Sequence, residues 1–256
     1  MLYDLSKLPL AIQQSIEKDY FKLFSTFPDR LFSIGADTKT VKGQELDVLT
    51  GIVYLSPYKI SGVNMCPSAK LAECHVGCLN TAGRGKFTSN QMSRLRKTLF
   101  LQQYPEVFKV LVRKEINRLK RKASRMNMLP MVRMNGTSDK RWELFMPEIF
   151  LEYPEVQFYD YTKIPNRKLG NIQNYDLSFS YSGVKAYQPM VAKALKKNMR
   201  LAVVFRSKDN QPKTFLGRKV INGDMTDIRP YDPQGVIVAL YAKGDAIHDK
   251  SGFVVD

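Results

Sequence analysis

The sequence has only two histidines and three cysteines among 256 residues, and several motifs that would name a reaction are missing. It has no Gly-x-x-x-x-Gly-Lys-Ser/Thr phosphate loop, no Gly-x-Gly-x-x-Gly dinucleotide motif and no Gly-x-Ser-x-Gly nucleophile elbow. His75 and His248 lie far apart, so no His-x-His pair is available for a metal-dependent tyrosine endonuclease. These absences exclude the enzyme classes that depend on those motifs.

Long apolar runs are also missing. The first thirty residues carry five charged side chains before Phe21 and no uninterrupted apolar core, which excludes an ordinary secretory signal. No run approaches the roughly 20 apolar residues of a membrane span. We therefore expect a soluble cytoplasmic protein with no membrane partner. In a reducing compartment, clustered cysteines are more often ligands or plain thiols than disulfides.

The hydrophobic pattern predicts an α/β protein. Apolar strands and amphipathic helices alternate from Leu129 to Tyr241 at the spacing of βα units. We expect mostly parallel strands in a full or partial (β/α) barrel, or in an open sheet. No linker divides the chain, so residues 1–256 are predicted to be a single domain. Within it, residues 1–45 would form an N-terminal helix (Ser6 to Phe24) and a loop, and residues 46–256 a barrel-like core.

Polar clusters follow the predicted strands. One of them, Asn135-Gly-Thr-Ser-Asp139, comes directly after the strand that begins at Leu129. In parallel α/β folds, functional groups gather in loops at the carboxyl ends of strands, and this places a candidate site there. The alternative is a turn with a helix cap, in which Ser138 or Asp139 satisfies backbone amides.

The three cysteines lie close together, at Cys66, Cys74 and Cys78, in the loop after the first confident strand. Three soft thiolates from one loop suit an iron–sulfur cluster with one open iron. They also suit zinc, with His75 or a more distant group as the fourth ligand. Free cysteines that pack as small hydrophobes are the third interpretation.

Positive charge is concentrated in one segment. The chain carries a net charge of +16, and residues 84–125 hold thirteen Lys or Arg against two Glu, a net +11. This segment contains a predicted pair of basic helices, Ser89 to Gln103 and Pro105 to Met126. Such a patch can bind nucleic acid with strong salt dependence, although many charge runs are only solvated helix faces. The candidate nucleic-acid-binding residues are Arg84, Lys86, Arg94, Lys97, Arg113, Arg118, Arg121 and Arg125.

The cysteine run, together with Val132 to Asp139, Phe158 to Lys163 and Val220 to Asp224, resembles uncharacterised proteins of bacteriophages and plasmids. These proteins look like distant cousins of the radical S-adenosylmethionine barrels. The resemblance implies that Cys66, Cys74 and Cys78 bind a [4Fe–4S] cluster. It also places Asn135, Thr137 and Asp139 near S-adenosylmethionine. The cysteine spacing departs from the usual one in that superfamily, and no Gly-Gly-Glu motif follows the second strand.

Two hypotheses follow. The first is a phage-type, radical-S-adenosylmethionine-like iron–sulfur protein, in the host cytoplasm, that acts on or binds nucleic acid. The second is a DNA-binding protein of phage replication without a cluster, in which the cysteines are structural or hold zinc. Neither substrate nor oligomeric state follows from the sequence.

Overall fold

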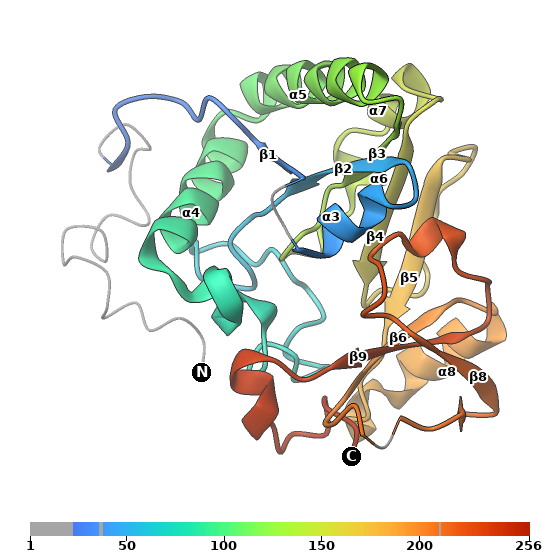
Figure 1. Ribbon diagram of the computed structural model, residues 1–256. Coiled ribbons are helices and arrows are strands. Elements are labelled where there is room, and N and C mark those ends of the chain that lie inside the picture. The colour runs from blue at the N-terminus through green and yellow to red at the C-terminus, as the bar shows by residue number, and fades with distance from the viewer. Residues whose placement is uncertain (1–22, 36–37, 210) are drawn as a thin grey trace.

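The computed structural model describes residues 23–35, 38–209 and 211–256. The predicted N-terminal helix lies almost entirely outside these residues. In the described part of the chain, the strands form one sheet in the order β1-β2-β3-β4-β5-β6-β9-β8-β7 (Figure 1). Neighbours from β2 to β8 are parallel, whereas β1 and β7 are antiparallel edge strands. The α/β class and the mostly parallel strands are therefore confirmed.

The central strands succeed one another in chain order, as βα units do. Their bounds are β1 Phe32–Ile34, β2 Val48–Val53, β3 Leu129–Arg133, β4 Gln157–Thr162, β5 Tyr175–Ser180, β6 Leu201–Phe205, β7 Thr214–Phe215, β8 Arg218–Asn222 and β9 Ile237–Tyr241. No pairing joins β1 to β7 in the residues that are described, so the sheet is open. The closed-barrel form of the prediction is not confirmed.

Helices fill the connections between the strands. The α-helices are α3 Thr38–Gln44, α4 Thr88–Gln103, α5 Pro105–Arg125, α6 Trp142–Phe145, α7 Glu148–Glu152 and α8 Gln188–Lys196. Short 3-10 helices are η2 Leu79–Thr81, η3 Gly83–Lys86, η4 Lys185–Tyr187, η5 Arg229–Tyr231 and η6 Gly244–His248. The basic pair α4 and α5 agrees with prediction within a residue. None of the described helices is long and apolar enough to cross a membrane.

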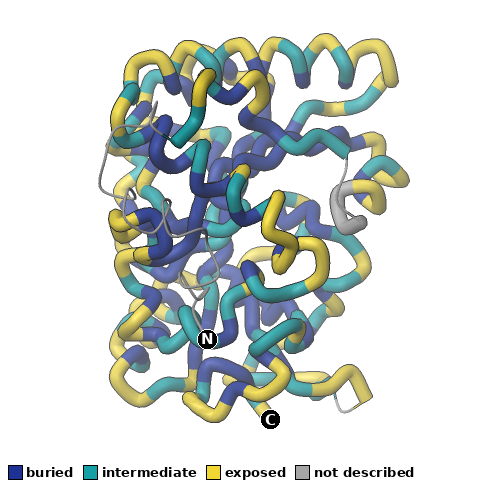
Figure 2. Tube along the Cα trace, turned by 90° about the vertical axis from the view of Figure 1, so that its left-hand side faces the viewer, coloured by how far each residue is buried: buried dark blue, intermediate teal, exposed yellow. Residues whose placement is uncertain are grey.

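The two faces of the sheet are covered differently. Val132 and Phe158 point into the main core, which contains the buried side of α5: Phe108, Val112, Ile116, Leu119 and Ala123. Because side chains alternate along a strand, Met131 and Tyr159 lie on the opposite face, in a small cluster with Val48 and Ile228. Ile228 belongs to the β8–β9 connection. Figure 2 shows the buried chain running through the middle of the molecule.

The segment from Asp29 to Gly43 was predicted to be a loop, and that prediction is wrong in part. It contains β1, which pairs with β2, and α3. Gly43 lies against the side chain of Ile228, where an added Cβ would come within 2.8 Å of Ile228 Cδ1. Long-range packing, rather than a local apolar pattern, therefore holds this segment.

Candidate functional site

A long loop between β2 and α4, residues 54–87, crosses the carboxyl edge of the sheet. The Ser182 hydroxyl, just after β5, donates a hydrogen bond to the Ala72 carbonyl at 2.8 Å. Further along, the backbone N–H of Asp245, just after β9, donates to the Thr81 hydroxyl at 3.2 Å. The loop and η6 therefore lie side by side although they are far apart in sequence (Figure 1). The predicted position of the cysteines, at the strand ends, is what the structure shows.

Within this loop the three thiols are only partly exposed. Burial raises the pKa of all three, that of Cys78 to about 11. The negative charges of the Cys78 and Cys74 thiolates also raise the pKa of Cys66, and that of Cys74 raises the pKa of Cys78, which places all three in one electrostatic neighbourhood. The Cys66 sulfur accepts a hydrogen bond from the Tyr58 N–H at 3.3 Å. In the absence of a cation, the three groups are held as neutral thiols.

The chemistry of this donor set fits a soft metal or an iron–sulfur cluster, because a bound cation removes the cost of forming the thiolates. The side chains are not arranged as the ligands of a bound metal ion or cluster are arranged. Among the described residues, no group of three or more His, Cys, Asp or Glu is arranged to hold a metal ion. Binding a cluster therefore requires the 66–78 part of the loop to close around it.

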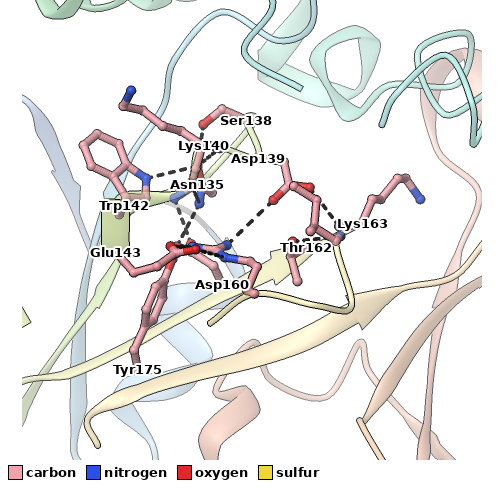
Figure 3. Close-up of polar contacts among 12 residues, drawn as sticks. Asn135, Ser138, Asp139, Lys140, Trp142, Glu143, Asp160, Thr162, Lys163 and Tyr175 are labelled. Carbon is pink, nitrogen blue, oxygen red and sulfur yellow. Dashed lines mark hydrogen bonds and ion pairs between the residues drawn. The ribbon is translucent and has the colours of Figure 1, made fainter. Parts of the chain in front are cut away.

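Beside the thiol loop, Asn135 organises a buried polar network that joins the end of β3 to Asp160 within β4 and to Tyr175, the first residue of β5 (Figure 3). Its side-chain N–H groups donate to the Lys140 carbonyl and to Asp160 Oδ2, both at 3.0 Å. Its Oδ1 accepts from the Ser138 hydroxyl at 2.9 Å, the Lys140 N–H at 2.9 Å and the Trp142 indole N–H at 3.1 Å. Every hydrogen-bonding position of this amide is used within the protein.

Asp160, the main partner of Asn135, is fully buried. Burial raises its pKa to about 6, although the Tyr175 hydroxyl donates to Oδ2 at 2.7 Å and favours the charged form. Arg167 completes the network through a two-pronged contact with Glu143 and a 3.0 Å hydrogen bond to the Tyr175 hydroxyl. The cluster is a set of buried charges that satisfy one another.

Asp139 differs from Asn135 because it keeps an unused oxygen. Its Oδ2 accepts a hydrogen bond from the Lys163 N–H at 2.8 Å. Its Oδ1 and the Arg167 Nη1 lie 3.8 Å apart, and both lack a hydrogen-bond partner although they are buried. Burial raises the pKa of Asp139. Of the three predicted cosubstrate residues, this one retains a polar atom that a small ligand or a water molecule could meet.

Gly136 and Thr137 together shape the turn that follows β3. The Thr137 hydroxyl donates to the Leu55 carbonyl at 2.5 Å, which ties the turn to the start of the thiol loop. Gly136 is required for a packing reason. A Cβ at this position would lie 2.5 Å from Tyr54 Cδ1 and 2.8 Å from Ile52 Cγ2. In the sequence, a glycine after a strand suggests only that the backbone must turn freely, whereas the structure shows a close approach of side chains.

Lys163, after β4, links the network to the thiols. Its ammonium donates to the Ser180 carbonyl at 3.1 Å, the Ser180 hydroxyl at 3.0 Å and the Tyr181 carbonyl at 3.3 Å. Burial lowers its pKa, while the nearby Cys74, Asp139 and Cys66 raise it. In the sequence, Lys163 ends another polar cluster after a predicted strand, Asp160-Tyr-Thr-Lys163, but it is not among the predicted site residues. A lysine directly after a strand, next to an Asp and two Tyr, was the available signal.

The candidate nucleic-acid-binding residues do not form one surface. Arg94 is buried and donates to the Asn80 side chain, and burial lowers the pKa of Lys97 to about 8. Arg84 and Lys86 are exposed on η3, near the thiol loop. Arg94 and Lys97 therefore take part in internal structure, whereas Arg84 and Lys86 form a separate exposed site.

On α5 itself, several cations are paired with glutamates. Arg113 contacts Glu152 through Nε and Nη2, both at 2.7 Å, and Glu148 at 3.4 Å. Lys120 pairs with Glu155, and Arg118 pairs at 2.7 Å with the fully buried Glu115 of the same helix. Of the predicted residues on this helix, Arg121 and Arg125 are exposed.

The opposite face of the sheet holds a second buried charge cluster, around Asp227. In the sequence this region, from Asn222-Gly-Asp224 to Asp227, favours a tight turn. Asp227, on the β8–β9 connection, forms an ion pair with Arg133 and accepts a 3.0 Å hydrogen bond from the Tyr161 hydroxyl. The Tyr159 hydroxyl and Arg133 Nε are buried without a hydrogen-bond partner. The alternation of side chains along β4 indicates this cluster in the sequence. Residues 159 and 161 lie on one face of the sheet, and residues 158 and 160 lie on the other.

The fold and the site define a mixed α/β protein with a polar, thiol-bearing carboxyl edge on a mostly parallel sheet. The sequence model of the gene product 88 family matches residues 30–256, so the chain belongs to this family. That membership agrees with the phage-protein part of the resemblance. Searches of curated proteins and of solved structures find no match, and nothing in them supports the radical S-adenosylmethionine part.

Proposed function

We propose that the chain is a phage-encoded iron–sulfur protein of the host cytoplasm, with its cluster on Cys66, Cys74 and Cys78. One observation carries the proposal: a single loop holds three partly buried thiols at the carboxyl edge of parallel strands, with the Cys66 sulfur 3.8 Å from the Thr137 carbonyl and Ala72 hydrogen-bonded to Ser182. That edge is where α/β proteins place their chemistry. The strand order β2 to β6, each strand following the last, is also the order in a partial barrel.

A bound [4Fe–4S] cluster would supply one-electron chemistry at this edge. The chain's own residues supply the surroundings. Lys163 places a buried cation near Cys74 and Cys66, which offsets the negative charge that three thiolates bring. Asp139 offers its unused Oδ1 beside Arg167, and a cosubstrate with an amino or carboxylate group, such as S-adenosylmethionine, has groups that these two side chains would recognise.

The test is anaerobic purification followed by visible spectroscopy and assays for iron, sulfide and zinc. We expect the broad visible absorbance of a cluster, with iron and sulfide in similar amounts. Cys74→Ala should abolish that absorbance. His75→Ala, at the adjacent position, is the matched control and should leave it unchanged. A colourless, metal-free and stable protein would contradict the proposal.

The second candidate function is nucleic-acid binding without a cluster, with structural cysteines or a zinc ion. The observation in favour of its structural-cysteine form is that no group of metal ligands is already arranged among the described residues. The same preparation distinguishes the two candidates. Zinc without sulfide, lost in His75→Ala, would support the zinc form, since His75 is the nearest fourth ligand in sequence.

Nucleic acid is the proposed partner under both candidates. Its support is the net charge of +16, with +11 of it in residues 84–125. Charge of this kind favours association with polyanions and makes that association sensitive to salt.

A further inference from the structure

The outward side of α5 carries four cations without an acidic partner among the described residues. They are Lys114, Arg121, Lys122 and Arg125, which we call the α5 stripe. Lys114, Arg121 and Arg125 are exposed, and Lys122 is half-buried. Steps of seven and four residues place Lys114, Arg121 and Arg125 on one helical face. Figure 2 shows this helix at the top of the molecule, with exposed turns along its outer side.

The neighbouring side of the same helix behaves differently. Lys109 pairs with Glu106 at 3.0 Å, Arg113 with Glu148 and Glu152, and Lys120 with Glu155. We call Lys109, Arg113 and Lys120 the paired flank. Its charges are largely cancelled at short range, so the field of α5 comes from the stripe. The number of cations on the two sides is similar, but only the stripe has charge left for a partner.

The carboxyl-terminal end of the stripe borders a shallow, open surface groove. Lys120, Arg121, Ser124 and Arg125 line this groove, which has a volume of about 600 Å³. Lys120 is paired with Glu155, so the available charge is that of Arg121 and Arg125, and Ser124 has a hydroxyl that can donate to an anion. Arg125 donates to the Arg121 carbonyl at 3.3 Å through Nε, which leaves its terminal N–H groups without an acceptor among the described residues. This lining suits a phosphate group.

The helix dipole explains only part of the pattern. Cations in the last turn of a helix are favourable in themselves, which accounts for Lys122 and Arg125. Lys114 and Arg121 lie further back, where that effect has faded. Their placement on the same outward face needs another reason. Membrane binding does not explain it, because the apolar side of α5 is buried in the core and cannot enter a bilayer.

We infer that the α5 stripe binds the phosphate backbone of nucleic acid, an inference that rests on the proposed nucleic-acid partner. From Lys114 to Arg125 the helix rises by about 16 Å, which matches about five successive phosphates of one duplex strand at about 3.4 Å each along the axis. Lysine and arginine contacts to phosphate carry no sequence information. Binding is therefore independent of base sequence, and Arg94, Lys97, Arg113 and Arg118 take no direct part in it.

The experiment compares the full chain with two double variants in DNA binding across a salt series. The stripe variant is Lys114→Gln and Arg121→Gln. The paired-flank variant, Lys109→Gln and Arg113→Gln, removes the same formal charge from the same helix and leaves Lys120, which lines the groove, in place. For duplex DNA, two lost phosphate contacts flatten the plot of log K against log salt by about 1.8. The wild-type affinity should therefore fall about 12-fold more than the stripe variant's between 50 and 200 mM salt.

The paired-flank variant should keep a slope close to that of the wild type. Equal losses in both variants would overturn the inference, since they would show that net charge alone matters. So would a stripe variant that binds like the wild type. No binding by the wild type at low salt would instead contradict the nucleic-acid partner itself. Anionic phospholipid vesicles form a separate arm, and stripe-dependent binding to them without DNA binding would assign the stripe to membranes.

Discussion

Replacing Asn135 by alanine should destabilise the fold strongly, because the structure gives this side chain a scaffolding role. The amide makes five hydrogen bonds, and all its partners lie in the network at the ends of β3 and β4. The resemblance to radical S-adenosylmethionine proteins instead places this residue beside a cosubstrate. The two roles predict different outcomes for the same substitution.

The magnitude follows from the groups that the substitution leaves behind. The Trp142 indole N–H and the Lys140 N–H both lose their acceptor, and Trp142 is fully buried. An orphaned buried donor costs about 1–3 kcal/mol, so two of them cost about 2–6 kcal/mol. At about 2–4 °C per kcal/mol for a chain of this size, a central value of about 4 kcal/mol lowers Tm by about 8–16 °C.

The assay is urea denaturation followed by circular dichroism, with Asn117→Ala as the matched control. Asn117 is exposed on α5, where alanine is the better helix former, and this control should stay within about 0.5 kcal/mol of the wild type. If Asn135→Ala loses less than about 1 kcal/mol, the scaffolding argument fails. A ligand-binding role for the side chain would then become the better explanation.

Three further substitutions test other parts of the structure. Burial raises the pKa of Asp160 to about 6, above the value near 3.9 of an unfolded aspartate, so the folded chain holds this proton more tightly. The stability advantage of the wild type over Asp160→Asn should therefore shrink as pH rises from about 4 to 7 in urea titrations, and a constant difference would contradict this. Asp227→Ala leaves Arg133 buried and unpaired, which should lower the free energy of unfolding by about 3–5 kcal/mol in urea denaturation. The double variant Arg133→Met with Asp227→Leu should recover most of that lost stability, because no unpaired charge remains. Gly136→Ala drives a Cβ into Tyr54 and should cost about 1–3 kcal/mol, and an unchanged Tm would show that the turn relaxes freely.

Local patterns predicted the parts of the fold that local physics determines. The apolar face of α5 repeats at steps of three and four, and the helix begins at Pro105, where a proline at the first position is favourable. The strands β3 to β6 and β9 follow from short apolar runs, and their ends agree with prediction within about two residues. For α4 the sequence predicts Thr88 or Ser89 as the N-cap, and that prediction is wrong. Phe87 holds the N-cap position, and no side chain caps the helix.

Elements held by distant contacts could not be found in this way. Strand β1 has three residues and depends on its pairing with β2. Helix α3 packs near Ile228, which lies far along the chain, and its own sequence has few apolar residues. The same limit applies to the site. The amide of Asn135 resembles a ligand-binding group in the sequence, and only the position of Asp160 and Trp142 in space shows that its hydrogen bonds are already used.

The charge of the basic segment shows most clearly why a local count misleads. Residues 84–125 carry a net +11 by themselves. Folding then brings Glu148, Glu152 and Glu155 from the region of α7 onto one side of α5, where they pair with Arg113 and Lys120. Net charge is unchanged by this, but its distribution is not. A helix that seems uniformly basic in sequence becomes a helix with one neutralised side and one cationic side. A polyanion at short range senses that distribution more than the total, because screening removes the contribution of charges beyond about 10 Å.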